Sequence, residues 1–299
     1  MALLLCAGTK ADVEINSLTI NKCASDSITR ILAIGNSFSV DAVEHHLFDL
    51  AKAANKPVII GSLAIAGGNL DQHLSNAIGN SNPYIYTKID VNGKKTTTFN
   101  NSIEPILTSE RWDYISFQQV SQYSGMYSTF VTPLPRLLYY VNQRATNPNV
   151  RYVLHQTWAY AQNSTHSGFA NYGNNQLIMY RAIVDAYKQA RVLTGIRIII
   201  PAGTAIQNGR TSAIGDKFTR DGFHLEESFG RYTAACAWFE KLFGISVIGN
   251  SFKPVGVSDY YREIAQHAAH FAARKPNKVT KLKNFQRVSD MSSRRGVTN

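Results

Sequence analysis

Three side chains in this sequence have the types needed for acyl transfer: a serine, a histidine and an aspartate. Ser37 stands in the turn Gly35-Asn36-Ser37-Phe38-Ser39, and Asp221 and His224 stand in Asp221-Gly222-Phe223-His224. A serine hydroxyl attacks a carbonyl carbon only when a base takes its proton. A histidine can be that base when a carboxylate holds its other ring nitrogen. Taken alone, the serine is typical of a helix cap and Asp-Gly is typical of a turn. The three side chains form a catalytic set only if the fold brings them into contact.

The residues around these side chains predict alternating strands and helices. Strands are predicted at residues 31–35, 57–66, 114–119, 150–157 and 196–200, and helices at 40–54, 69–78, 134–145, 176–193, 226–243 and 259–273. Residues 84–99 predict a β-hairpin around Asn92-Gly93. The alternation predicts an α/β fold, a three-layer α/β/α sandwich over a mainly parallel five-stranded sheet, in one domain of residues 29–274.

The predicted strand ends bring the polar residues together. Ligands of open parallel sheets bind beyond the carboxyl ends of the strands. Ser37 follows the first predicted strand, Gly67-Gly68 the second, Gln118-Gln119 the third and Trp158 the fourth, and Asp221 to His224 lie in the loop after the last. This edge of the sheet therefore holds a serine, a histidine, an aspartate and several amide donors, which is an inventory for acyl transfer.

The sequence resembles the SGNH (GDSL-type) hydrolases at three points. Gly35 to Ser39 resembles their first block, Gly-Asp-Ser-x-Ser, with Asn36 in place of Asp, and Asp221 to His224 resembles their Asp-x-x-His block. Gly68 falls at their second-block glycine, within Gly67-Gly68-Asn69-Leu70-Asp71-Gln72-His73, which is similar to an element of a branch known mostly as a domain of unknown function. The resemblance spans residues 31 to about 243. It implies a flavodoxin-like SGNH hydrolase fold, with Ser37 as nucleophile, His224 as general base and Asp221 as the orienting acid.

The same resemblance implies an oxyanion hole built from the backbone N–H groups of Ser37 and Gly68 and one side-chain amide. The family's Gly-x-Asn-Asp block is missing here, because the third strand runs into Phe117-Gln118-Gln119-Val120-Ser121-Gln122. A glutamine amide can donate to an oxyanion as an asparagine does. We predict Gln118 as the third donor, with Gln122 as the second choice.

Substrate contacts are predicted from the loops at this edge of the sheet. Asn36, Gln122, His73 and Trp158 are the candidates, and the polar stretch 162–175 is either a lid, a sugar-stacking rim or an ordinary surface loop. These loops are rich in amides and aromatic rings, which suit a sugar better than an aliphatic chain. The predicted activity is hydrolysis of carboxylic esters, above all O-acetyl groups on carbohydrate, through an acyl-enzyme. The alternatives are a broader carboxylesterase or thioesterase, or a glycan-binding module of this fold without competent chemistry.

Cofactors, metals and nucleotides receive no support from the motifs. No group of cysteines and histidines has zinc spacing, and no phosphate-binding glycine loop is present. The predicted partner is a small-molecule or glycan ester, and no nucleic acid is expected. No membrane span is expected either, because no run of 18 apolar residues occurs. The oligomeric state stays open.

Charge and composition define the two ends of the chain. The chain has 299 residues, is 44% hydrophobic, which suffices for a sizeable core, and has a formal net charge of +11. Residues 275–299 carry seven Lys and Arg residues against one Asp, so we predict a basic, flexible tail, with polyanion binding as the minor alternative. Residues 1–28 are predicted to be an N-terminal arm or signal remnant, with Leu3 to Cys6 similar to a lipoprotein box. We predict export to the periplasm or to the exterior, with or without a lipid anchor.

Overall fold

The computed structural model describes residues 28–286, in which seven strands form one sheet. The strand order is β4-β3-β2-β1-β5-β6-β7. The strands are β1 (Thr29–Gly35), β2 (Val58–Ala64), β3 (Tyr84–Ile89), β4 (Lys95–Asn101), β5 (Tyr114–Phe117), β6 (Arg151–His155) and β7 (Ile198–Ile200). The predicted α/β sandwich is confirmed.

The sheet is larger than predicted. The five strands β2, β1, β5, β6 and β7 are parallel, as expected. The predicted hairpin does not stand apart from them, because β3 pairs antiparallel with β2 and β4 pairs with β3. Tyr84, Tyr86 and Ile89 of β3 are buried, and this burial fixes the hairpin to the sheet. The prediction of a five-stranded sheet is therefore wrong, because β3 and β4 extend the sheet to seven strands.

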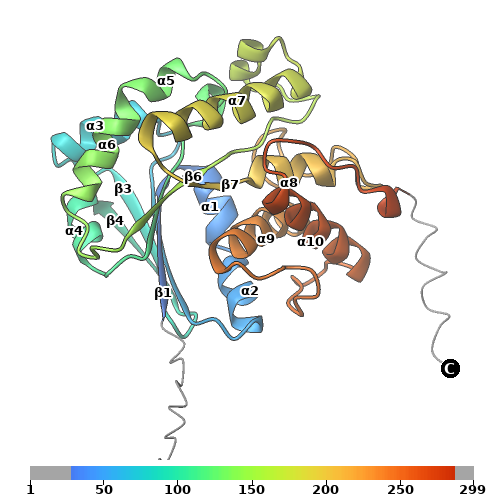
Figure 1. Ribbon diagram of the computed structural model, residues 1–299, viewed down its shortest axis with the longest axis horizontal. Helices are drawn as coiled ribbons and strands as arrows, with labels where there is room; N and C mark the ends of the chain where they lie inside the picture. Colours follow the sequence, from blue (N-terminus) through green and yellow to red (C-terminus); the bar gives the residue numbers. More distant parts are fainter. Residues whose placement is uncertain (1–27, 287–299) are drawn as a thin grey trace, which may run out of the picture.

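Helices cover both faces of the sheet (Figure 1). One layer contains α1 (Ser37–Val43), α2 (Leu47–Ala53), α8 (Ala202–Gly209), α9 (Phe229–Phe243) and α10 (Asp259–Arg274), which pack on one another. The other contains α3 (Leu70–Ile78), α4 (Ile103–Thr108), α5 (Ser128–Val131), α6 (Pro133–Asn142) and α7 (Gln176–Thr194). Three short 3₁₀ helices also occur within residues 28–286, at Ser121–Tyr123, Ser167–Tyr172 and Lys283–Phe285. None of the helices between residues 28 and 286 combines the length and apolar character of a membrane span.

The helix predicted at residues 40–54 is two helices. Glu44 ends α1 and forms an ion pair of 2.9 Å with Lys95 of β4, and α2 begins after His46. The helical spacing of apolar residues continues through the break between α1 and α2, so the sequence pattern could not reveal that break. The split lets α1 begin at Ser37, directly after β1.

The strand register aligns the carboxyl ends of the central strands. Gly35 lies beside Ala64 of β2, and Ile34 lies beside Phe117 of β5. The residues that follow these strands therefore meet at one edge of the sheet. Ile31 to Ile34 are fully buried, as expected for a central parallel strand covered on both faces.

Part of the predicted flexible tail packs on the domain. Leu282 and Phe285 are buried, and the Phe285 ring lies 5.0 Å from the His267 ring of α10. The backbone N–H of Thr280 donates to Asn208 Oδ1 at 2.7 Å. The predicted tail boundary at 275 is therefore wrong, because these apolar side chains hold residues 275–286 against α8 and α10. The predictions for residues 1–27 and 287–299 lie outside the described residues.

Replacing Phe285 by alanine tests this packing. Phe285→Ala removes a buried ring and should lower the free energy of unfolding by about 3 kcal/mol, measured by urea denaturation. The control Val255→Ala changes a fully exposed side chain and should stay within about 0.5 kcal/mol of the wild type. Equal stability of both variants would show that the segment does not depend on its apolar anchor.

Candidate active site

Asn36 sets the start of the helix that carries the serine. Its backbone is extended, its Oδ1 accepts the N–H of Phe38 at 3.0 Å, and its Nδ2 donates to the Gly68 carbonyl at 2.9 Å. Ser37 is thus the first residue of α1, where backbone N–H groups have no acceptor inside the helix. Asn36 is almost fully buried, so its predicted contact with substrate is wrong: both ends of its amide are engaged inside the protein.

The structure brings together the three side chains predicted to be catalytic. Ser37 Oγ lies 2.9 Å from His224 Nε2, and His224 Nδ1 lies 2.6 Å from Asp221 Oδ2. Ser37 is half-buried, and His224 and Asp221 are partly exposed. The serine hydroxyl can donate to one ring nitrogen while the other donates to the carboxylate. This is the arrangement in which an imidazole can take a serine proton.

Asp221 is held in its ionised form by its own loop. Burial by itself would raise the pKa of this carboxyl, but hydrogen bonds from the His224 ring and from the Phe223 and His224 backbone N–H groups lower its pKa below the ordinary value. Its Oδ1 accepts those two N–H groups at 3.1 and 2.7 Å. One oxygen therefore shapes the loop while the other fixes the imidazole.

A buried carboxylate on α1 fastens the histidine loop to the serine helix. Asp41 is only 2% exposed. Its oxygens accept the Leu225 N–H at 2.9 Å, Arg231 Nε at 2.8 Å and Arg220 Nη1 at 3.2 Å. Arg220 also donates its backbone N–H to the His224 carbonyl at 2.9 Å, and its guanidinium donates to the Leu225 carbonyl. The Asp41 carboxylate thereby joins α1, which carries Ser37, to the loop that carries His224.

Gln118 braces the ends of two strands. Its Oε1 accepts the Asn36 N–H at 3.1 Å and the Ser39 hydroxyl at 3.0 Å, and its Nε2 donates to the Gln119 carbonyl at 2.6 Å. The side chain is 1% exposed. A Cβ at Gly35 would lie 2.6 Å from Gln118 Oε1, so the brace requires glycine there. The prediction that Gln118 donates to an oxyanion is wrong, because its amide is buried and bonded.

The Gly67-Gly68 turn offers a different backbone donor from the one predicted. The Gly68 N–H closes the turn by donating to the Ile65 carbonyl at 3.0 Å. Gly67 adopts φ +64°, which favours glycine. Within residues 28–286 the Gly67 N–H has no acceptor. In this turn the N–H of Gly67, and not that of Gly68, is therefore without an acceptor in the described residues.

Gln122 is the predicted residue whose amide nitrogen stays free. It is half-buried, and no partner for its Nε2 occurs in the described part of the chain. Its backbone carbonyl accepts Asn171 Nδ2 at 3.2 Å and the Tyr172 hydroxyl at 3.0 Å. The 162–175 stretch thus holds Gln122 in place while leaving its amide available.

His73 and Trp158 are packing residues, and their predicted contacts with substrate are wrong. His73 is fully buried, lies 2.9 Å from the Tyr84 hydroxyl through Nδ1, and has its pKa lowered to about 4 by burial. Trp158 is fully buried, stacks on Phe38 with ring centroids 4.3 Å apart, and donates to the Phe223 carbonyl at 2.7 Å. Trp158 therefore supports both α1 and the histidine loop from inside.

The 162–175 stretch packs beside the histidine loop. The Ala161 N–H donates to the Gly222 carbonyl at 2.8 Å, and the His166 ring lies 4.8 Å from the Phe223 ring. His166 Nδ1 accepts the Gly168 N–H at 3.0 Å, so its neutral form carries the proton on Nε2. Burial is the main cause that lowers the pKa of His166. A neutral N–H donor and an aromatic ring therefore stand at the rim of the site.

Metal binding has no support in the site. Across residues 28–286, no group of three or more histidine, cysteine, aspartate and glutamate side chains could hold a metal ion.

Sequence reasoning missed the Asp41 cluster. Asp41 stands in the first helix and looks like an ordinary cap candidate, and its partners Arg220 and Arg231 are far along the chain. One signal was present, since Arg220 directly precedes the Asp-x-x-His motif. A cation at that point needs an acid nearby, but the sequence does not say which one.

Replacing Asp41 by asparagine tests this cluster. Asp41→Asn keeps the shape but leaves two arginines without their buried partner, so the free energy of unfolding should fall by about 2–5 kcal/mol. Urea denaturation measures this. The control Asp185→Asn breaks an exposed pair with Lys188 and should change stability by less than about 1 kcal/mol. A loss at Asp41 no larger than at Asp185 would contradict the assigned role.

Comparison with known proteins gives a family. A domain of unknown function, DUF4886, matches residues 30–272. A DUF4886 family protein from Bacteroides uniformis ATCC 8492 is similar over 87% of this chain and 100% of its own, at 47% identity and a TM-score of 0.85.

More distant solved structures are also similar. A putative SGNH hydrolase from Slackia heliotrinireducens covers 72% of this chain and 99% of its own, at 20% identity and a TM-score of 0.47. The acetylxylan esterase Axe2 from Geobacillus stearothermophilus covers 76% and 97%, at 10% identity and a TM-score of 0.45. No curated protein matches. On the extent of the family match and the 47% identity, the chain belongs to the DUF4886 family.

Proposed function

We propose that this protein is a serine esterase that removes O-acetyl groups from carbohydrate. The observation that carries the proposal is the unbroken relay from Ser37 Oγ to His224 Nε2 at 2.9 Å and from His224 Nδ1 to Asp221 Oδ2 at 2.6 Å. Each member occupies the position that its role requires, and the loop keeps Asp221 ionised.

The proposed reaction has two steps. Ser37 Oγ attacks the ester carbonyl carbon while its proton passes to His224 Nε2, and the oxyanion then collapses as that proton moves to the departing sugar oxygen. Water next attacks the acyl-serine and gives its proton to His224. Acetate leaves, and Ser37 recovers its proton. Asp221 stabilises the imidazolium in both steps without taking a proton.

Three donors are proposed for the oxyanion. The Ser37 N–H lies at the start of α1 and the Gly67 N–H in the turn after β2, and neither has an acceptor in the described residues. The free Nε2 of Gln122 supplies the third. Donors of this kind stabilise the charge that appears only in the transition state.

The rim favours a polar substrate. Gln122 Nε2 and His166 Nε2 are free to hydrogen-bond, and the half-buried Phe223 ring offers an aromatic edge or face. Hydroxyl groups of a sugar would be satisfied by such donors, whereas an aliphatic chain would leave them unpaired. A broader carboxylesterase or thioesterase uses the same relay, and substrate panels separate the two. The complete relay favours catalysis over the non-catalytic glycan-binding alternative.

Replacing the serine tests the proposed function. Ser37→Ala should abolish acetate release from p-nitrophenyl acetate and from acetylated glycans, because no nucleophile remains. The control Ser167→Ala changes an exposed serine of the neighbouring stretch and should keep full activity. Turnover by folded Ser37→Ala at the wild-type rate would contradict the proposal, and glycan binding without turnover in the wild type would favour the binding module.

Replacing Gln122 by alanine tests its proposed role as the third oxyanion donor. Gln122→Ala should lower kcat by about 10²–10³-fold with a smaller change in KM, since an oxyanion donor acts in the transition state. Its thermal stability should stay near that of the wild type. The control Gln189→Ala alters an exposed side chain of α7 and should have no effect. An unchanged kcat in Gln122→Ala would assign the third donor elsewhere.

The acid limb of the pH profile should report a single protonation. A protonated imidazole cannot accept the Ser37 proton, so kcat/KM should drop as the pH falls. The lowered pKa of Asp221 keeps its carboxylate ionised through this range, so it should not add a second step. The measurement is kcat/KM between about pH 5 and 8, and a flat profile would contradict the role of His224.

A further inference from the structure

A cavity lies at the other end of the strands from the triad. It has a volume of about 560 Å³ and is lined where the last turns of α7 and α9 approach the residues that lead into β7. Four of its lining side chains are cationic: Lys188, Arg191, Arg197 and Lys241. Because Arg197 precedes β7 and the triad follows the carboxyl ends of its neighbours, the two sites are separate.

The cations of this cavity are largely unneutralised. Its described lining contains no acidic side chain. Lys188 pairs with Asp185 at 3.2 Å, but Arg191, Arg197 and Lys241 have no ion pair or side-chain hydrogen bond within residues 28–286. Glu240, next to Lys241 in the chain, is engaged with His270 at 2.8 Å.

Helix ends explain only part of this charge. Arg191 and Lys241 lie in the last turns of α7 and α9, where a cation offsets the negative end of the helix dipole. Arg197 stands at no helix end. A neighbouring cavity of about 410 Å³ shares Gly195, Ile196 and Arg197 and adds Arg151, so the positive lining continues past the β7 edge.

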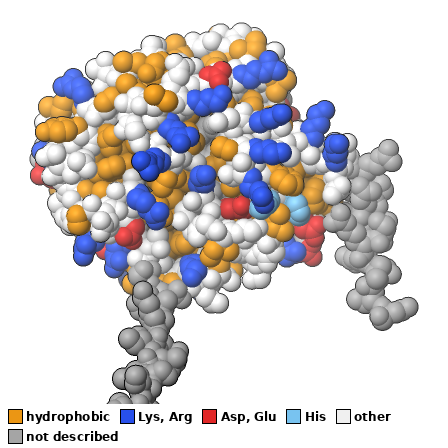
Figure 2. Space-filling model, viewed as in Figure 1, with side chains coloured by type: hydrophobic (Ala, Val, Ile, Leu, Met, Phe, Trp, Pro, Cys, Tyr) orange, Lys and Arg blue, Asp and Glu red, His pale blue; other side chains and the backbone are white. Residues whose placement is uncertain are grey.

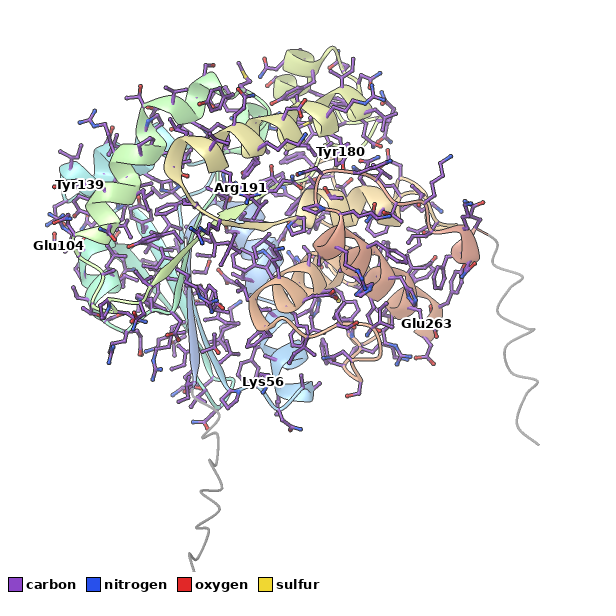
Figure 3. All side chains as sticks on the ribbon, in the orientation of Figure 1. Lys56, Glu104, Tyr139, Tyr180, Arg191 and Glu263 are labelled. Atoms are coloured by element: carbon purple, nitrogen blue, oxygen red, sulfur yellow. The ribbon has the colours of Figure 1, made fainter. Side chains whose placement is uncertain are left out.

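The pictures show the same gathering of charge. Figure 3 places Arg191 beside β7, between the helices of the two layers. Figure 2 shows Lys and Arg side chains spread across the middle of this face, with few acidic side chains between them.

We propose that this cavity binds a multiply anionic carbohydrate through its sulfate or carboxylate groups. Guanidinium groups bind such planar or tetrahedral oxyanions with two parallel hydrogen bonds. The rest of the described lining is aliphatic or small, including Val192, Ile196 and Pro276, and offers no aromatic ring. Stacking on aromatic rings is what holds the bases of single-stranded nucleic acid, and this lining offers none. The anionic groups of a charged sugar need only the cations, so the proposed contact is made through those groups and not through ring stacking.

The test is calorimetric binding of the full chain to two anionic sugars and one rival. A heparin-derived sulfated oligosaccharide and an oligogalacturonate separate sulfate from carboxylate, and a single-stranded oligonucleotide of equal charge represents the other class of polyanion. The site variant is Arg191→Ala/Arg197→Ala/Lys241→Ala. The matched control, Lys94→Ala/Arg136→Ala/Arg181→Ala, removes the same charge from exposed side chains elsewhere.

The expected result is specific to the cavity. The wild type and Ser37→Ala should bind at least one of the two sugars equally well, the site variant should bind it at least about tenfold more weakly with a shallower salt dependence, and the control should stay within about twofold. If the triple variant does not fold, Arg191→Gln/Arg197→Gln serves in its place. Equal losses in site and control variants, tighter binding of the oligonucleotide, or no sugar binding by the wild type would each overturn the proposal.

Discussion

The buried carboxylate of Asp41 is the interaction on which the candidate site depends. Ser37 and His224 are 187 residues apart in the chain, yet their side chains lie only 2.9 Å apart. This contact requires that α1 and the loop before α9 keep a fixed distance. Asp41 sits on α1 and accepts hydrogen bonds from Arg220, Leu225 and Arg231. A carboxylate excluded from water is stable only with such partners. The loop therefore cannot leave α1 without breaking the hydrogen bonds that Asp41 accepts from Arg220, Leu225 and Arg231.

The parallel sheet supplies the second constraint. Aligned strand ends bring the Ser37 turn, the Gly67-Gly68 turn and the end of β5 to one edge. Gln118 and Asn36 then join these three segments by hydrogen bonds through their buried amides. The amides of Asn36 and Gln118 thus hold the frame, and the donor that we propose for the oxyanion lies four residues further along the chain, at Gln122.

The parts of the site that could be predicted are those encoded by short local patterns. Ser37, Asp221 and His224 stand in motifs that follow predicted strands, and the strand order brings these motifs to one edge of the sheet. Their final distances depend on the Asp41 contacts, which no local pattern shows. The choice between Gln118 and Gln122 could not be predicted, because it depends on which amide finds an internal partner. The predicted contact of Trp158 with substrate was wrong for a similar reason, because its stacking on Phe38 joins residues that are far apart in the chain. The two added strands were visible as a hairpin, but their docking on β2 depends on burial that no local pattern shows.

The central claim is that Ser37 is a nucleophile activated by His224. Reaction of the full chain with a fluorophosphonate, followed by intact-mass and peptide-mapping mass spectrometry, tests it most directly. We predict one covalent adduct, located on Ser37, with labelling at least about 10²-fold slower in His224→Ala. An adduct on another residue, or equal labelling rates in the wild type and His224→Ala, would contradict the account.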